Sequence, residues 1–333
     1  MVSHRRPGDP PRPGPRTWRP WRSAWLDAAY SPTGFWSTQQ PGGHFSTAVR
    51  AGPLVAQAVA ALVPASVGVV VDVGAGDARL LAHLADLLPG VALVGVDRRV
   101  RPEGLDPRVG WFRDHFDVER ERWTNGGPDA WSSAGTPFLV AHEWLDDLPV
   151  PVVGRRAGTW HEVEVDGRGH ERPGAAVGAE DRAWLADWWE SGSPEVVRAE
   201  VGRARDAAWA VLVRWAVARG GRALAVDYGH LATQRPVEGS LLAYGRGRQR
   251  APVPDGSVNL TAAVAVDALV RAGEDAGAET LLLERQSAVL GRHPEPAPAD
   301  PLGALVRRSE QAALTAPGRW GDLWWLLQGA RAS

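Results

Sequence analysis

Residues 67–78, with the sequence VGVVVDVGAGDA, decide the fold of this 333-residue chain. Residues 67–73 are short and rich in β-branched side chains, and they predict a buried strand. Gly74 and Gly76 follow at once and predict a tight turn, because glycine tolerates backbone conformations that other residues avoid. Residues 79–88 then have a helical pattern. A strand, a glycine turn and a helix in this order are typical of an α/β unit.

The same alternation continues on both sides of this stretch. A helical pattern covers residues 51–63, and a long amphipathic helix is predicted from Pro194 to Arg219. Further buried strands are predicted at residues 91–96, 109–112, 137–141 and 222–226. Strands that alternate with helices imply a doubly wound, mostly parallel sheet, so the predicted fold class is α/β.

The chain divides into a core and flanking segments. Residues 1–20 contain six proline and five arginine residues without periodicity, and we expect a disordered basic tail there. Residues 154–192 are polar and rich in tryptophan, and we expect them to be an insertion or lid. The remaining segments are a helical N-terminal part at 21–66, a core at 67–290, a proline-rich linker at 291–301 and a helical tail at 302–333.

Composition excludes several kinds of chemistry. The 37 basic and 39 acidic residues give a net charge of −2, which argues against a polycationic nucleic-acid-binding protein. The chain has no cysteine and no lysine, so thiolate metal sites, thiol nucleophiles and Schiff-base lysines are excluded, and we predict no metal site. No secretory signal and no apolar run of about 18 residues is found, so we expect a cytoplasmic protein without a membrane span.

The glycine turn predicts a cofactor site, because its backbone lets a ligand approach the start of the following helix. Dinucleotide enzymes carry a third glycine where this chain has Arg79, so a nicotinamide-dependent oxidoreductase is the weaker alternative. Enzymes that use S-adenosylmethionine place an acid two residues before Gly-x-Gly, as Asp72 does here. A carboxylate suits the ammonium and sulfonium of that cofactor. Asp97, which ends the next strand, can accept hydrogen bonds from ribose hydroxyls in either class.

Polar residues also follow the strand at 137–141. His142 and Glu143 come directly after it, at the sheet edge where open α/β proteins bind ligands. A carboxylate there can hold a cationic acceptor and help to remove its proton, so Glu143 is the first candidate catalytic residue and His142 the second. Asp146 and Asp147 follow within one turn and are candidate substrate-binding residues. Acids that favour the dipole of a following helix are the alternative account of these two.

Ordered blocks between residues 30 and 290 carry a resemblance to a known family. They are TGFW at 33–36, GHFST at 43–47, DVGAG at 72–76, HEWLDDLPV at 142–150, WHE at 160–162, DYG at 227–229, GSLLAY at 239–244 and NLT at 259–261. In order and spacing these blocks resemble the MidA-like S-adenosylmethionine-dependent methyltransferases, with this chain as a divergent, actinobacterial-type member. Mitochondrial members of that family are complex I assembly factors that methylate a protein arginine.

The resemblance implies a fold, a cofactor and a partner. The fold is a Rossmann-like class I methyltransferase with a seven-stranded sheet, the cofactor is S-adenosyl-L-methionine, and the substrate is a protein such as a respiratory complex I subunit. Residues 21–66 would then cover the cofactor. The cofactor contacts implied by the matching blocks are Gly43, Phe45, Thr47, Gly74, Gly76 and Asp97.

Three further residues complete the candidate site. Asp114, just past the strand at 109–112, is a candidate for the adenine, and a solvated loop acid is the alternative interpretation. Asp227 and Tyr228 are implied near the substrate channel by the resemblance, although aromatic residues such as Tyr228 and Tyr244 are more often core residues.

The chain also departs from the family pattern. His142 replaces the usual asparagine, His44 replaces the usual aspartate, and residues 48–50 lack the usual glutamate. These departures favour a second hypothesis, in which the chain is a catalytically weak assembly or scaffold protein that keeps the fold and the cofactor.

Overall fold

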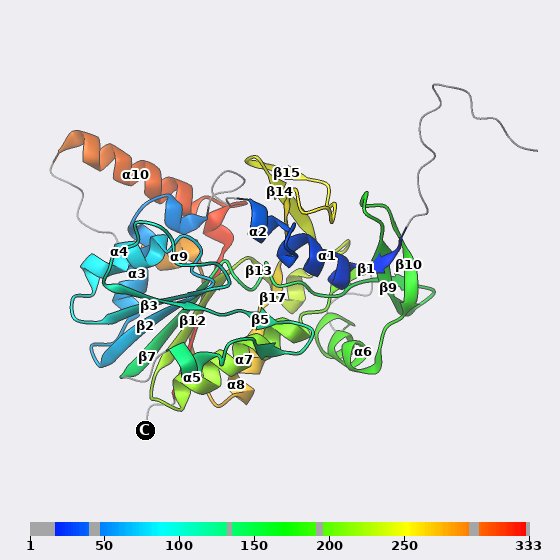
Figure 1. Ribbon diagram of the computed structural model, residues 1–333, viewed down its shortest axis with the longest axis horizontal. Helices are drawn as coiled ribbons and strands as arrows, with labels where there is room; N and C mark the ends of the chain where they lie inside the picture. The colour runs from blue at the N-terminus through cyan, green and yellow to red at the C-terminus, as the bar shows by residue number, and fades with distance from the viewer. Residues whose placement is uncertain (1–16, 40–46, 132–134, 191–195, 293–299, 331–333) are drawn as a thin grey trace, which may run out of the picture.

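The structure, a computed structural model, describes residues 17–39, 47–131, 135–190, 196–292 and 300–330 (Figure 1). Within these residues the main sheet has seven strands in the order β18-β19-β12-β7-β2-β3-β4. The five strands from β4 to β12 pair in parallel, whereas β19 runs antiparallel to both β12 and β18. The strands are β2 (Val67–Val73), β3 (Ala92–Asp97), β4 (Val109–Arg113), β7 (Thr136–His142), β12 (Arg222–Asp227), β18 (Glu279–Arg285) and β19 (Trp324–Gly329).

The strands predicted around the glycine turn are confirmed. β2, β3, β4, β7 and β12 differ from the predicted ranges by no more than one residue at either end. Val69, Val70 and Val71 of β2 are all buried, although successive side chains point to opposite faces of the sheet. A strand covered on both faces needs a continuous apolar run, which is the pattern that made these strands predictable.

Helices cover both faces of the main sheet (Figure 1). One face is packed by α3 (Leu54–Leu62), α4 (Arg79–Leu87) and α9 (Gln286–Gly291), and the other by α5 (Pro128–Trp131), α7 (Arg203–Val217) and α8 (Val266–Asp275). In α4, Leu80, Leu81 and Leu84 are buried, and each contributes about 1.5–3 kcal/mol to folding.

The long helix begins later than predicted. We expected it from residue 194, but α7 starts at Arg203, and Arg198–Glu200 form the short strand β11. β11 pairs with β8, and the backbone of Val197 and Arg198 donates to the carbonyl of Val237. Tertiary pairing has therefore overridden the helical pattern here.

A second, antiparallel sheet lies beside the first. Its order is β1-β9-β8-β11, and β10 also pairs with β9. The strands are β1 (Arg19–Pro20), β8 (Val152–Arg156), β9 (Thr159–Val165), β10 (Glu171–Ala176) and β11. Helix α1 (Trp21–Tyr30) packs against it, with α2 (Phe35–Thr38) beyond, and α6 (Ala179–Leu185) continues into a π-helical turn, η3 (Ala186–Glu190). The region expected to be an insertion or lid forms most of this sheet.

The C-terminal segment is not a purely helical tail. Helix α10 (Pro301–Thr315) is followed by a 3-10 turn, η5 (Trp320–Asp322), and then by strand β19. β19 lies inside the main sheet between β18 and β12, with Trp325 fully buried. The prediction of a helical tail at 302–333 is therefore wrong for its second half, and the core does not end at residue 290. The predicted tail at 1–20 falls mostly outside the described residues.

Short elements complete the described fold and surround the carboxyl ends of the parallel strands. They are η2 (Ala48–Arg50), η4 (Ala232–Gln234), the pair β5 (Phe116–Asp117) and β6 (Arg122–Trp123), the pair β13 (Gly229–His230) and β17 (Val264–Ala265), and the sheet of β14 (Leu242–Gly245), β15 (Arg248–Arg250) and β16 (Asn259–Thr261). In the described part of the chain, no helix is long and apolar enough to cross a membrane.

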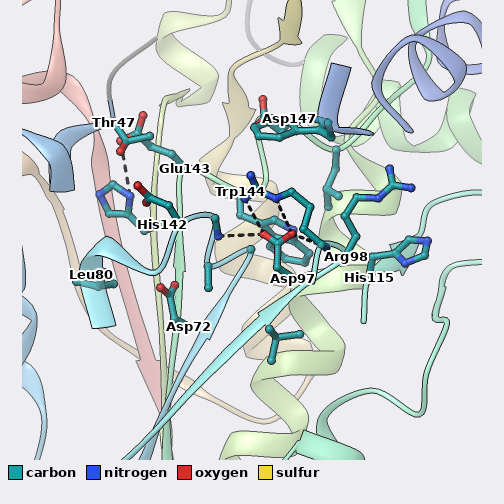
Figure 2. Close-up of a pocket in the computed structure, with 18 of the residues that line it drawn as sticks. Thr47, Asp72, Leu80, Asp97, Arg98, His115, His142, Glu143, Trp144 and Asp147 are labelled. Atoms are coloured by element: carbon teal, nitrogen blue, oxygen red, sulfur yellow. Dashed lines mark hydrogen bonds and ion pairs between the residues drawn. The ribbon is translucent and has the colours of Figure 1, made fainter. Parts of the chain in front are cut away.

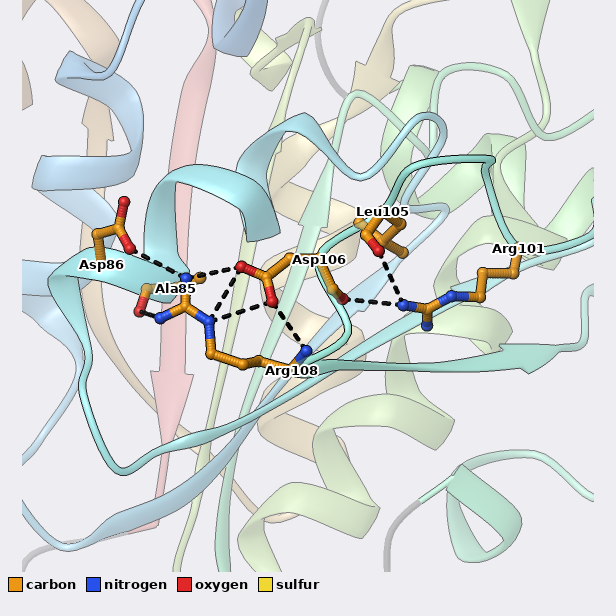
Figure 3. A network of polar contacts seen from close by, with 6 residues as sticks. All are labelled: Ala85, Asp86, Arg101, Leu105, Asp106 and Arg108. Atoms are coloured by element: carbon orange, nitrogen blue, oxygen red, sulfur yellow. Dashed lines mark hydrogen bonds and ion pairs between the residues drawn. The ribbon is translucent and has the colours of Figure 1, made fainter.

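A polar network fixes the loop between β3 and β4 to helix α4 (Figure 3). Arg108 donates to the carbonyl of Ala85 (3.0 Å) and forms ion pairs with Asp86 (3.0 Å) and Asp106 (2.6 Å). Arg101 donates to the carbonyls of Leu105 and Asp106. Because these charges are exposed, the network mainly sets the path of the loop and adds little stability.

Candidate functional site

The turn after β2 is held by hydrogen bonds to β3. The N–H of Gly74 donates to the carbonyl of Val96 (2.8 Å), and the N–H of Gly76 donates to Oδ2 of Asp97 (2.9 Å). Both glycines have positive φ, +73° and +61°, and a Cβ on Gly74 would lie 2.4 Å from Cδ1 of Trp144. Glycine is required here because the turn is left-handed and because Trp144 packs directly against it.

A cavity of about 150 Å³ lies over this turn, where β2, β3 and β7 end (Figure 2). We call it the first cavity. Tyr30, Trp36, Trp123 and Trp144 supply aromatic surface to it. Among the predicted cofactor residues, those that line it are Thr47, Asp72, Gly74, Gly76, Asp97 and Asp114. The predicted residues Gly43 and Phe45 lie outside the described residues.

Asp72 is the buried acid of the first cavity. It is 3% exposed, and no described residue donates a hydrogen bond to it. Burial raises its pKa well above the ordinary value, and the negative charges of Asp97 and Asp77 raise it further. A buried carboxyl without a donor favours a cation in the adjoining space, because a cation would compensate the desolvated charge.

Asp97 and Asp114, two further acids that line the first cavity, already have partners. Asp97 accepts from the N–H groups of Gly76 (2.9 Å) and Arg99 (2.8 Å), and the Arg99 side chain pairs with it as well. Ribose hydroxyls would therefore compete with the Arg99 guanidinium. Asp114 accepts from the N–H of Gly127 (2.9 Å), from Nε1 of Trp131 (3.0 Å) and from the Thr124–Asn125 backbone. Asp114 therefore organises the loop before α5, which does not favour the adenine contact predicted for it.

Glu143 leaves β7 in a left-handed backbone conformation with φ +48°. Such a φ is uncommon for a non-glycine residue and is concentrated at functional sites. Its Oε1 accepts from the N–H of Ala48 (2.8 Å), which begins η2, so the N-terminal segment reaches the end of β7. Burial raises the pKa of Glu143 to about 8, the Ala48 N–H lowers it, and the charge of Asp146 raises it.

His142 lies beside Glu143 at the end of the strand (Figure 2). Its Nδ1 is 3.6 Å from Oε1 of Glu143, and its Nε2 is buried without a hydrogen-bond partner among the described residues. Burial lowers the pKa of His142 to about 4, so its imidazole is neutral at physiological pH. The ring therefore carries no charge, and at 3.6 Å it forms no hydrogen bond with Glu143.

A second cavity of about 800 Å³ adjoins the end of β7 on the other side. Its polar lining includes Glu143, Asp146, Asp147, Tyr228, Tyr244 and Thr261. Tyr228 and Tyr244 thus face a cavity, although aromatic residues are more often core residues. No described residue between 154 and 192 lines either cavity, and the expectation of a lid there stays a prediction.

Asp227 holds the acidic loop that follows Glu143 and contains Asp146 and Asp147. Oδ2 of Asp227 accepts from the N–H groups of Leu145 (2.8 Å) and Asp146 (3.3 Å). Asp227 is not among the described residues that line the second cavity, and its predicted substrate contact stays a prediction. Burial raises the pKa of Asp227 and of Asp147 well above the ordinary value, and the charge of Asp146 adds to both shifts.

Arg205 of α7 also supports this loop and was missed by the sequence analysis. It is 1% exposed, and its guanidinium donates to the carbonyls of Asp146 (2.8 Å), Leu148 (2.9 Å) and Ala262 (2.8 Å). It supplies a buried positive charge behind the acidic loop. A signal was present, because Arg205 occupies the apolar face of α7 with Ala208, Trp209 and Leu212, where a charge is unusual.

Glu143 and Asp147 line both cavities. The two cavities therefore meet at the carboxyl end of β7, with a buried carboxyl group at the junction. A glycine turn, a buried acid and an adjoining acidic cavity at this sheet edge define a cofactor-binding α/β protein of the group-transfer type. Among the described residues, no group of His, Asp and Glu is placed to hold a metal ion.

Comparison with known proteins gives the family. A family model described as "Putative S-adenosyl-L-methionine-dependent methyltransferase" matches residues 105–283, more than half of the chain. The chain belongs to this family of S-adenosyl-L-methionine-dependent methyltransferases, and S-adenosyl-L-methionine is the cofactor of the family. The MidA-like subfamily is not resolved by this match. No curated protein matches the chain.

Two solved structures from Burkholderia thailandensis share the fold. One is a COG1565 superfamily member bound to S-adenosyl-homocysteine, with 25% identity, a TM-score of 0.75 and coverage of 94% of this chain and 88% of that chain. The other is an uncharacterized COG1565 superfamily protein, with 24% identity, a TM-score of 0.70 and coverage of 94% and 87%. The mixed α/β architecture is thus shared over nearly the whole chain.

The lining of the first cavity has the chemistry that the family cofactor needs. The left-handed glycine turn leaves open space above Gly76, where a Cβ would have only Nη2 of Arg99 and the carbonyl of Gly74 nearby. Asp72 offers an uncompensated acid to a cationic group, and the aromatic side chains offer flat apolar surface to a base. These features belong to this chain and are independent of the comparisons.

Proposed function

We propose that this protein transfers a methyl group from S-adenosyl-L-methionine to the guanidinium of an arginine side chain in a protein. The first cavity holds the cofactor, and the second admits the acceptor. One observation carries the proposal, namely that Glu143 lines both cavities and so stands where the two reactants meet. The acidic lining of the second cavity and the resemblance to the MidA-like family support a cationic acceptor.

The fold supports the same proposal. We infer that the main sheet is the Rossmann-like class I methyltransferase sheet, in which one antiparallel strand is inserted beside the parallel strands. β19 is that strand, between β12 and β18. In this arrangement the candidate residues come from the carboxyl ends of β2, β3 and β7, where open α/β sheets bind ligands.

The residues of the chain have distinct tasks in this proposal. When bound, the cofactor supplies an electrophilic methyl group on a sulfonium. Asp72 compensates positive charge in the first cavity, and the glycine turn admits the ligand to the backbone. Glu143 orients the acceptor nitrogen and takes its proton as the new N–C bond forms. Asp147 borders both cavities and holds the acceptor cation beside Glu143.

The raised pKa of Glu143 fits this sequence of events. With the second cavity free, a carboxyl with a pKa of about 8 is mostly protonated at neutral pH. A guanidinium placed beside it favours the charged form, so binding of the acceptor releases a proton and prepares a carboxylate. The same carboxylate can then accept the proton that the methylated nitrogen loses.

Tritium transfer from S-adenosyl-L-methionine tests the proposal. We expect label in arginine residues of proteins from a deletion strain, identified by mass spectrometry, and much less label in the wild-type strain, where the sites are already methylated. Cofactor binding without transfer to any protein would instead support the scaffold hypothesis. Label on lysine or on a small molecule would overturn the arginine assignment and leave the methyltransferase assignment in place.

A further inference from the structure

The mouth of the second cavity is formed by two loops far apart in the sequence. The turn at residues 246–247 joins β14 to β15, and the loop at residues 318–320 leads into η5 and β19. Gly247, Arg319 and Trp320 all line the cavity. The hairpin of β14 and β15 projects from the body of the molecule next to α2 (Figure 1).

Two exposed arginines lie at this mouth, because Arg319 lines the cavity and Arg246 directly precedes Gly247, which also lines it. Arg246 and Arg319 are exposed, and their side chains form no hydrogen bond or ion pair with any described residue. Arg246 also has a positive φ of +52°, which places it at the tip of the turn. The formal net charge of the whole chain is −2, so a basic mouth is a local feature and not a general property of the surface.

The hairpin register separates two kinds of arginine. Tyr244, which lines the cavity, pairs with Gln249, so these two side chains share one face of the ribbon. Arg248 and Arg250 pair with Gly245 and Ala243 and lie on the opposite face. A partner seated over the cavity would thus contact the turn at Arg246 before it contacts the outer pair.

The interior of the same cavity has the opposite charge. Glu143, Asp146 and Asp147 line it, and the part of the chain that the structure describes gives it no cation other than Arg319. The charges thus change sign from the mouth to the interior. A ligand that complements both regions carries a cation at its tip and anions around that cation.

We propose that the mouth of the second cavity, at Arg246 and Arg319, docks an acidic protein segment that presents one cationic side chain to the interior. This inference rests on the proposed function for the identity of the cationic side chain. It adds the chemistry of the flanking sequence, which the acidic interior alone does not specify. The exposed arginines would recognise flanking carboxylates, and would speed encounter with the partner through long-range attraction.

A nucleic acid fits the mouth less well. A polyanion would satisfy Arg246 and Arg319, but it would bring further phosphates toward Glu143, Asp146 and Asp147 without a cation to compensate them.

Fluorescence anisotropy with a designed peptide tests the docking surface. The probe is a fluorescein-labelled nonapeptide with three glutamates, glycine, arginine, glycine and three glutamates in that order. We expect the double variant Arg246→Glu and Arg319→Glu to raise its Kd about tenfold or more, because two exposed attractions become repulsions. A peptide with glutamines in place of glutamates should bind the unchanged protein about tenfold more weakly and lose its salt dependence.

Arg168→Glu is the matched control. Arg168 is also an exposed arginine in a hairpin turn whose side chain has no partner among the described residues, and it lines neither cavity. Its substitution should leave the Kd of the acidic peptide within about twofold. All these positions are exposed, so the melting temperatures of the variants should match that of the unchanged protein.

The outcomes separate this inference from the proposed function. Unchanged Kd in the double variant, equal binding of the glutamine peptide, or tighter binding of a labelled thymidine oligonucleotide than of the acidic peptide would each overturn the docking surface. Since the readout is binding, it does not require turnover. Tight, charge-dependent binding of the peptide without its methylation would contradict only the proposed function. Methylation at the same rate with glutamates or glutamines in the peptide would contradict only the docking surface.

Discussion

At the scale of single residues, Glu143 is the residue on which the site depends. It combines an unusual backbone conformation, a hydrogen bond from the N–H of Ala48 and a place in the lining of both cavities. Each of these features constrains where its carboxyl group points. The burial that raises its pKa to about 8 is unfavourable for the free protein, and together with its place between the two cavities it motivates the role that we propose.

Glu143→Gln should lower the rate of methyl transfer roughly a hundredfold while cofactor affinity changes little, because a proton acceptor is lost and the shape of the side chain is kept. Transfer is measured with tritiated cofactor and binding by calorimetry. Asp206→Asn is the control. Burial raises the pKa of Asp206 to about 7 as well. However, Asp206 accepts a hydrogen bond from Nε1 of Trp184 and lines neither cavity, so methyl transfer should be unchanged. Full activity in Glu143→Gln would contradict the proposed role.

The same substitution predicts a pH-dependent gain in stability. The pKa of Glu143 is about 8 in the folded protein, against an ordinary value of 4.5, so the folded state retains a proton that the unfolded chain has lost between these values. The stability contribution of Glu143 is therefore complete below about pH 4.5 and is lost as the pH rises through about 8. The quantity to compare is the melting temperature of Glu143→Gln minus that of the unchanged protein. This difference should be at least about 2 °C larger above about pH 8 than below about pH 4.5. A difference that does not vary with pH would argue against the buried, protonated carboxyl.

At the scale of elements, the loop between β2 and α4 and the strand β19 illustrate two kinds of predictability. The β2–α4 unit was predictable because a continuous β-branched run, two glycines and an amphipathic helix are all local signals. β19 was not, because Trp324–Gly329 becomes a strand only by pairing with β12 and β18, which are distant in sequence. The cavity mouth was missed for the same reason, since Arg319 was assigned to a helical tail.

Gly76→Ala should weaken cofactor binding at least about tenfold, because a methyl group would intrude on the open space above the turn. Gly90→Ala provides a matched control. Gly90 has a positive φ of +86°, no atom within 4 Å of the point where a Cβ would lie and no place in either cavity lining. Both variants should lose roughly 1 kcal/mol of stability from the left-handed backbone, but only Gly76→Ala should change the calorimetric affinity. Equal affinities would mean that the ligand does not approach this turn.

Trp325→Ala should lower the free energy of unfolding by roughly 3–5 kcal/mol, as for other fully buried tryptophans. Trp325 is fully buried in β19, and its Nε1 donates to Oε1 of Gln286 in α9 (3.2 Å). Leu305→Ala on the exposed side of α10 should change stability by less than about 0.5 kcal/mol. Denaturant unfolding measures both. A small loss for Trp325→Ala would show that β19 is not an integral strand of the main sheet.

At the scale of the whole molecule, the arrangement of charge unites the site. Acids gather where β7 ends, Arg205 supplies a buried countercharge behind them, and exposed arginines stand at the mouth of the second cavity. The sequence predicted the parallel strands and most of the acids, since these follow strands directly. It did not predict the hydrogen bonds of these acids. Asp114 and Asp227 accept from N–H groups that are distant in sequence, and no local pattern reveals such contacts.

The most direct test of the central claim is a crystal structure of the protein with S-adenosylhomocysteine. We expect the nucleoside over the turn at Gly74 and Gly76, the amino group toward Asp72, and the sulfur directed at the junction beside Glu143. Ligand density confined to the second cavity, or a first cavity that stays closed by Arg99 while the ligand binds elsewhere, would contradict it.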